Sequence, residues 1–253
     1  EAKLIRVIDG DTIEVELNNT QYSVRLIGIN TPESVAPDNY KTKNSIEGTE
    51  ASNTVKDMLS DIETIYLQKD ISSDLLNDLL ETSSRASTMG GMQLYSVVIT
   101  RNAEMKEKLS PAHFNQPMVK GAPVVLTFCA DFRRFSKWCE QRNAVPGYNN
   151  LMSFMNAAMD TLLVAQTFCT LAEEAGLGIC YLGTTTYNPQ MVIDALQLPE
   201  LVFPITTVTV GYPDGIPAQV DRLPLEATVH EEYYHDYSKA DIDKLYAYKE
   251  SLP

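Results

Sequence analysis

The sequence has few residues of the kinds that bind transition metals. It contains four cysteines and three histidines in 253 residues, and no two cysteines form a Cys-x-x-Cys pair. No histidine lies near a cysteine at the spacing of zinc ligands. We therefore expect no metal site of the zinc type, and we interpret the cysteines as reduced structural thiols.

Basic runs and long apolar runs are also absent. The formal net charge is -14, with 7 Lys+Arg against 13 Asp+Glu in residues 1–70 and 13 against 21 in the remainder. Because duplex nucleic acid is bound largely through lysine and arginine, we expect no nucleic-acid partner. No apolar run approaches the roughly 20 residues that cross a bilayer, and no signal peptide precedes the first strand-like pattern. The pattern favours a cytoplasmic protein without membrane contact.

Alternating apolar and β-branched residues dominate the first part of the chain. They predict a three-stranded meander over residues 3–8, 12–17 and 22–29, with turns at Asp9-Gly10 and Asn18-Asn19. Helical spacing follows over 47–59, and residues 63–67 form a short strand candidate. This order is typical of a small β-barrel that has been cut short.

After Asp70 the pattern changes without a glycine- or proline-rich linker. Ser73 or Asp74 is expected to cap an amphipathic helix, and strands are expected over 94–100, 123–129 and 201–212. Residues 149–175 predict a long helix that is apolar around most of its circumference, which must be buried in a core or a dimer interface. We therefore predict two joined modules, residues 1–70 and 71–253.

Two motifs in the first module carry a family resemblance. Asp9-Gly10-Asp11-Thr12 and the run from Val24 to Glu33 resemble the first half of staphylococcal-nuclease-like domains, which have an OB-type barrel. The resemblance implies calcium binding by Asp11, charge neutralisation by Arg25 and orientation of the attacking water by Glu33. Asn30 replaces a second calcium-binding aspartate, and the segment with another catalytic arginine is missing after Asp70.

Several motifs of the second module follow one another from Ser84 to Pro224. They are Ser84-Arg85-Ala86-Ser87-Thr88-Met89-Gly90-Gly91-Met92-Gln93-Leu94-Tyr95-Ser96, Asn115-Gln116-Pro117, Ala122-Pro123-Val124, Gly176-Leu177-Gly178, Cys180-Tyr181-Leu182-Gly183, Gly211-Tyr212-Pro213 and Arg222-Leu223-Pro224. Taken singly, residues 87–91 are more readily an ordinary loop, and Gly176-Leu177-Gly178 is more readily an ordinary C-terminal helix cap. As an ordered set they resemble the nitroreductase family of FMN enzymes. The resemblance implies an α+β fold with helices flanking a central, mainly antiparallel sheet.

The resemblance also implies a flavin site. A flavin needs an apolar slot, amide partners for its pyrimidine edge and cations for its phosphate. By resemblance, the small residues Ser87 and Thr88 lie beside the cofactor, and Gln93 and Gln116 are the amide partners. Leu182 and Gly183 lie against the redox face of the flavin, and Arg222 binds its phosphate. Gly91 and Val220 stand where the family usually has an asparagine and a lysine, and residues 1–70 replace its basic N-terminal helix.

The leading interpretation is a homodimer with FMN at the dimer interface. By resemblance, NAD(P)H would reduce FMN by hydride transfer, and a nitroaromatic, quinone or flavin would then be reduced in a ping-pong cycle. The flavin carries the chemistry, so no side chain is expected to act as acid, base or nucleophile. Two alternatives stay open: a calcium-dependent phosphodiesterase that uses Asp11, Arg25 and Glu33, and a chimera without catalytic activity.

Overall fold

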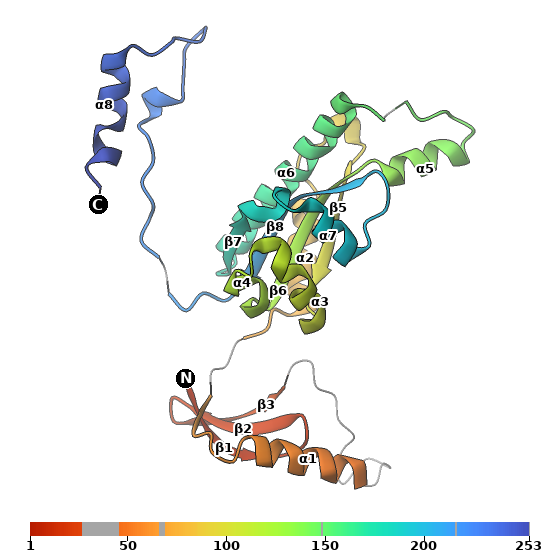
Figure 1. The fold of residues 1–253 in the computed structure, drawn as a ribbon, viewed down its shortest axis with the longest axis vertical. Coiled ribbons are helices and arrows are strands. Elements are labelled where there is room, and N and C mark those ends of the chain that lie inside the picture. Colours follow the sequence, from red (N-terminus) through yellow and green to blue (C-terminus); the bar gives the residue numbers. More distant parts are fainter. Residues whose placement is uncertain (27–45, 66–68, 148, 216, 253) are drawn as a thin grey trace. The chain divides into compact units, whose positions relative to one another are not determined.

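The computed structural model describes residues 1–26, 46–65, 69–147, 149–215 and 217–252 (Figure 1). The chain divides into two compact units, Glu1–Tyr212 and Pro213–Pro253. The first unit contains two separate four-stranded sheets, and the second contains one helix of regular length. Within the described ranges, no helix combines the length and the apolar character that a membrane crossing requires.

The first sheet is built from local hairpins. It contains β1 (Ala2–Val7), β2 (Thr12–Leu17), β3 (Thr20–Arg25) and β4 (Thr64–Ile65) in the order β3-β2-β1-β4, and α1 (Ile46–Met58) packs on β1. Asn18 and Asn19 link β2 to β3 with φ values of 51° and 61°, the left-handed pair that a two-residue type I′ hairpin requires. The predicted meander and helix are confirmed, except that residues 27–29 of the predicted third strand lie outside the described residues.

The predicted OB-type barrel is not found in the described part of this segment. All neighbouring strands of the first sheet pair in antiparallel fashion, but β3 and β4 are its two edges and do not pair with each other. A barrel requires closure of the sheet on itself. The strands therefore form an open sheet whose small core consists of Ala2, Ile13 and Val15.

The second sheet is the centre of the larger part of the chain. Its strands are β5 (Tyr95–Thr100), β6 (Val124–Asp131), β7 (Gly178–Leu182) and β8 (Val202–Gly211), in the antiparallel order β5-β6-β8-β7. Every residue of β6 is buried, as expected for a central strand that is covered on both faces. This confirms the three predicted strands and the α+β class, and β7 completes the sheet at its edge.

Two helices cover one face of this sheet. α6 (Leu151–Glu174) runs along the sheet (Figure 1), and α2 (Ser73–Ser83) packs against α6. Phe168 of α6 meets Phe128 of β6 with ring centroids 6.0 Å apart, at the centre of the largest apolar cluster. The long helix is confirmed, but the cap of α2 is Ser72, whose hydroxyl accepts a hydrogen bond from the Leu75 N–H, and not Ser73 or Asp74.

Short helices fill the connections between the strands. They are η1 (Met89–Gly91), α3 (Ala103–Leu109), η2 (Ser110–His113), α4 (Pro117–Gly121), α5 (Arg133–Gln141), η3 (Gly183–Thr186) and α7 (Pro189–Leu196). A second apolar cluster joins α3, η2, α4, β7 and α7 through Leu109, Ala112, Val119, Leu182 and Val192. The C-terminal unit contains η4 (Leu225–Ala227) and α8 (Lys239–Glu250), and Ser238 and Asp241 form a capping box at the start of α8.

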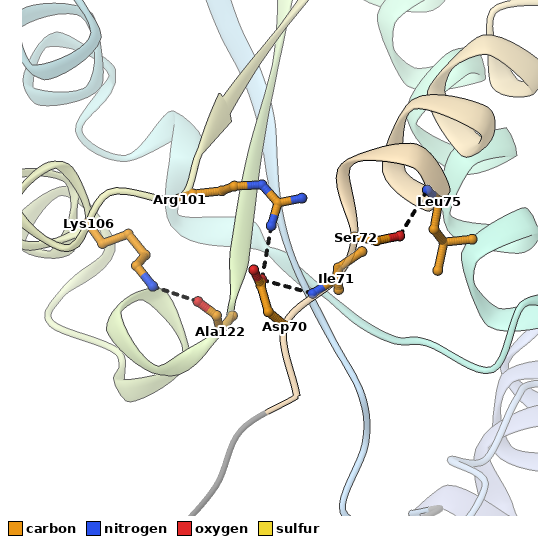
Figure 2. Close-up of polar contacts among 7 residues, drawn as sticks. All are labelled: Asp70, Ile71, Ser72, Leu75, Arg101, Lys106 and Ala122. Carbon is orange, nitrogen blue, oxygen red and sulfur yellow. Dashed lines mark hydrogen bonds and ion pairs between the residues drawn. The ribbon is translucent and has the colours of Figure 1, made fainter. Parts of the chain in front are cut away.

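The change of pattern near residue 70 coincides with an anchor (Figure 2). The Asp70 carboxylate accepts hydrogen bonds from Arg101 Nη1 at 2.9 Å and from the Ile71 N–H at 2.8 Å. Ile71 is fully buried in the main core, and the Lys69 ammonium lies 4.0 Å from the ring centroid of Tyr212. The chain therefore joins the second sheet and its helices at residues 69–71.

A hydrogen bond from Lys106 stabilises the connection between α4 and β6. Its Nζ donates to the Ala122 carbonyl at 2.8 Å, immediately before β6 begins (Figure 2). Burial lowers the pKa of Lys106, and the negative charge of Asp70 opposes that shift. The contact fixes the end of α4 where the chain turns into the central strand.

Replacing Phe168 tests the importance of the α6 packing. Phe168→Ala removes a fully buried ring, so we expect the free energy of unfolding to fall by roughly 3–5 kcal/mol in urea denaturation. Glu174→Ala, at an exposed position of the same helix, is the control and should change it by less than about 0.5 kcal/mol. Equal effects of the two changes would contradict this description of the core.

Candidate functional site

The small-residue loop before β5 is held by one buried carboxylate. Asp160 of α6 is only 2% exposed, and it accepts the backbone N–H of Met89 at 2.7 Å and that of Leu94 at 3.1 Å. Between these two contacts the chain bends through Gly90 and Gly91, whose φ values are 54° and 68°. The loop that resembles a flavin-binding segment is therefore pinned at both ends to the long helix.

Three of the predicted flavin ligands lie on this loop. Ser87 and Gln93 are exposed, and Thr88 is partly buried. Gln93 has a left-handed φ of 51°, and its carbonyl accepts a hydrogen bond from Arg134, which also donates to the Tyr95 carbonyl at 3.2 Å. The side chains of these ligands are thus carried on a backbone fixed from two sides.

An open cavity of about 560 Å³ borders the same loop. Gly90, Gly91 and Met92 form one wall, and α5 contributes the rest of its lining, Arg134, Phe135 and Trp138. The rings of Phe135 and Trp138 meet edge to face with centroids 5.6 Å apart. A glycine pair opposite an aromatic pair leaves room for a planar group.

Three other predicted ligands lie on the segments around the end of β7. Gln116 is the N-cap residue of α4, and its buried Oε1 has no hydrogen-bond partner within the described residues. The Leu182 side chain is buried in the second apolar cluster, whereas Gly183 is exposed and a Cβ added there would have no neighbour within 4 Å. Gly183 therefore offers open backbone, while Leu182 packs inward.

His113 is a polar residue of this region to which the sequence analysis assigned no role. It is fully buried, and its Nδ1 lies 2.9 Å from the Thr184 hydroxyl, so it connects η2 to η3. Its Nε2 has no partner among the described residues, and burial lowers the pKa of the imidazole. The available signal was its position, three residues before Gln116.

The two groups of ligands lie at different edges of one sheet. The loop with Ser87, Thr88 and Gln93 leads into β5, and Gly183 follows β7, while β5 and β7 are the two edge strands. Three strand spacings separate these edges, which corresponds to about 14 Å. Within one chain the predicted ligands therefore fall into two separate groups, one near each edge of the sheet.

Arg222 belongs to the C-terminal unit. Its Nη1 donates to the Asp221 carbonyl at 2.9 Å, and the Asp221 carboxylate pairs with Lys249 at 2.7 Å. This pairing lowers the pKa of Asp221. The role of Arg222 as a phosphate ligand stays a prediction.

Part of the nuclease-like constellation lies in the first sheet. Asp11 is buried, and its carboxylate pairs with Arg25 at 2.9 Å. Glu33 and Asn30 lie outside the described residues. In the part of the chain that is described, no group of three or more His, Cys, Asp or Glu side chains is arranged to hold a metal ion.

Comparison with known proteins identifies the larger part of the chain. The model of the nitroreductase family matches residues 65–212. The chain belongs to the nitroreductase family. It is 32% identical to FMN reductase [NAD(P)H] of Bacillus subtilis (strain 168) over 190 residues, which cover 74% of this chain and 76% of that relative.

Solved structures agree with this family membership. A protein of Bacteroides fragilis named only as an oxidoreductase is 80% identical, with a TM-score of 0.73 over 78% of this chain and 81% of the other. A nitroreductase of Bacillus subtilis is 29% identical, with a TM-score of 0.69 over the same shares. The predicted nitroreductase-like fold is thereby confirmed. The family match does not extend to residues 1–64, and none of these comparisons supports a nuclease-like segment.

Asp160 gives a direct test of the pinned loop. Asp160→Asn leaves one amide oxygen for two backbone donors, so we expect a loss of roughly 1.5–3 kcal/mol in the free energy of unfolding. Hydrogen exchange of the Met89 and Leu94 amides should become faster. Asp194→Asn, which changes an exposed carboxylate of α7, should alter neither measurement; unchanged exchange in Asp160→Asn would refute the role of this carboxylate.

Proposed function

We propose that this nitroreductase-family chain is an FMN-dependent oxidoreductase that takes electrons from NAD(P)H. Family membership and the likeness to an FMN reductase [NAD(P)H] support the proposal. The observation that carries it is a buried Gln116 Oε1 without a hydrogen-bond partner among the described residues, together with open backbone at Gly183. Bound FMN supplies the hydride and electron transfer from the donor to a nitroaromatic, quinone or flavin acceptor.

The residues of the chain bind and orient the cofactor in this proposal. The Gln116 amide would hold the hydrogen-bonding edge of the flavin, because a buried amide oxygen without a partner is stabilised by one. The backbone at Gly183 lies against the ring, and the buried Leu182 side chain excludes water behind it. Ser87, Thr88 and Gln93, which form the other group of predicted ligands, contact the cofactor, and Arg222 binds the phosphate. No side chain needs to move a proton.

Flavin binding by the purified protein tests the proposal. The wild-type chain should bind FMN with quenching of flavin fluorescence and should oxidise NAD(P)H when an acceptor is present. Gln116→Leu should weaken FMN binding about 10-fold, because one hydrogen bond of roughly 1.4 kcal/mol is lost. Gln190→Leu changes an exposed amide of α7 and serves as the matched control. Absence of FMN binding by the wild-type chain would favour a chimera without catalytic activity.

We propose further that the protein is a homodimer in which a second copy covers the outer face of α6. Six large apolar side chains of this helix are 45–75% exposed in the single chain, namely Leu151, Met152, Met155, Met159, Leu162 and Leu163. An apolar face of this size marks an interaction surface. The two separate groups of predicted ligands support the same arrangement, with each FMN at the interface and one group from each protomer.

Charge on the outer face of α6 should disrupt the dimer. The double variant Met159→Asp and Leu163→Asp places two carboxylates in the proposed interface, where burial of an unpaired charge is strongly unfavourable. Analytical ultracentrifugation should show a dimer for the wild-type chain and a monomer for this variant, with weakened FMN binding. Val145→Asp, at a highly exposed apolar position outside the helix, should stay dimeric. A monomeric wild-type protein would contradict the proposal.

We retain the division into residues 1–70 and 71–253 as a proposal about the modules of the chain. Two separate sheets and the anchor at Asp70 support it. The nuclease-like resemblance of the first module is assigned no activity, since Asp11 already pairs with Arg25. A reducing compartment such as the cytoplasm suits the four free cysteines; burial raises the pKa of Cys129 to about 12, which keeps this thiol inert.

A further inference from the structure

We propose that His113 is a positioning residue of the flavin site, which as a neutral imidazole holds the turn Gly183–Thr186 where its backbone meets the cofactor. This inference rests on the proposed function. His113 does not need to touch the flavin in this role, because it acts through Thr184 on the adjacent Gly183. The Nδ1 to Oγ1 distance of 2.9 Å is the contact that carries the effect.

The backbone around His113 is held in an uncommon conformation. Phe114 and Asn115, the next two residues, have backbone φ values of 53° and 55°, which residues other than glycine adopt rarely. The Asn115 N–H donates to the Ser110 carbonyl at 2.9 Å, and the Gln116 N–H donates to the His113 carbonyl at 3.1 Å. Such conformations persist where the surroundings require them, and they cluster at ligand sites. This turn fixes His113 and Gln116 relative to each other.

Unpartnered buried atoms gather in the same place. Five buried side-chain nitrogen or oxygen atoms have no hydrogen-bond partner among the described residues, and two of them are His113 Nε2 and Gln116 Oε1. A third, Thr207 Oγ1, belongs to the residue directly opposite Leu182 in the β7–β8 ladder. Because buried polar atoms are nearly always paired, this concentration points to a polar ligand beside η2 and η3.

The surroundings keep His113 neutral. The elements packed against η2 are α3, α4, α7 and η3, and their charged side chains are Glu104, Lys106, Glu107, Lys108, Lys120 and Asp194. Burial lowers the pKa of His113, and no neighbouring charge contributes to that shift. A protonated ring would bury a charge and present an N–H at Nε2 without an acceptor among the described residues.

Two side-chain replacements separate the functions of the two ring nitrogens. Asparagine places its amide close to the position of Nδ1, whereas glutamine places it close to Nε2. His113→Asn can therefore keep the bond to Thr184, and His113→Gln cannot. Thr184→Val removes the same bond from the other partner without changing the buried turn, and Thr184→Ser keeps the hydroxyl.

The experiment measures FMN affinity by fluorescence quenching, the visible spectrum of the bound flavin and the melting temperature of the apoprotein. We expect His113→Gln and Thr184→Val to weaken FMN binding about 10-fold and to shift the flavin absorbance bands, as loss of one buried hydrogen bond would. His113→Asn and Thr184→Ser should stay within about 3-fold of wild type. If His113→Asn and Thr184→Ser keep the FMN affinity and the flavin spectrum that the other two variants lose, the bond between the two side chains positions the turn.

The pH dependence provides a second measurement. Because the pKa of His113 is lowered in the folded protein, the unfolded chain binds a proton first as the pH falls. The stabilising contribution of the neutral ring is complete above the unfolded value of about 6.5 and decreases below it. FMN affinity of the folded wild-type protein should fall only at still lower pH, where folded His113 itself becomes protonated, and His113→Asn should remove this decline.

Three results would overturn the inference, and they are distinguishable. If His113→Gln and Thr184→Val lower the melting temperature but leave FMN affinity and the flavin spectrum unchanged, His113 is only a structural core residue. If His113→Asn is as impaired as His113→Gln, the contact with Thr184 is not the cause. If the wild-type chain binds no FMN, both the proposed function and this role of His113 fail.

Discussion

The packing of α6 against the central sheet is the constraint on which the rest of the structure depends. Its inner face meets β6 through Phe168 and Phe128, and this contact forms the middle of the main core. The same helix carries Asp160, which fixes the loop before β5, and its outer face remains apolar and exposed. One helix therefore joins the core, one half of the proposed flavin site and the proposed dimer interface. A change in its position would alter all three together.

The sequence allowed prediction of the elements whose pattern is strong. The strands around β6 and the helix over Leu151–Glu174 have long apolar stretches, and the ordered motifs led to the nitroreductase family. Short helices such as α3 and α7 were missed, because five to nine residues give too little periodicity to distinguish a helix from a loop. Ser72 was missed as the cap because Ser72, Ser73 and Asp74 are all good capping residues in succession.

The polar residues of the site were harder to predict than the core. Asp160 is the single charged side chain between Leu151 and Ala172, and that isolation was a readable signal of a buried role. His113 lay close to the Asn115-Gln116-Pro117 motif, but its partner Thr184 is 71 residues away, and no local pattern connects them. The expected barrel failed for a similar reason, since closure depends on pairing between distant strands, and the described strands leave the sheet open.

The long apolar outer face of α6 also has a kinetic consequence. A newly folded single chain presents Leu151, Met155 and Leu162 to water before any partner arrives. If the proposed dimer forms, such a species divides between productive pairing, whose rate rises with chain concentration, and non-specific clustering through the same side chains. The yield of active material should then be decided during biosynthesis, by how quickly each chain meets another of its kind.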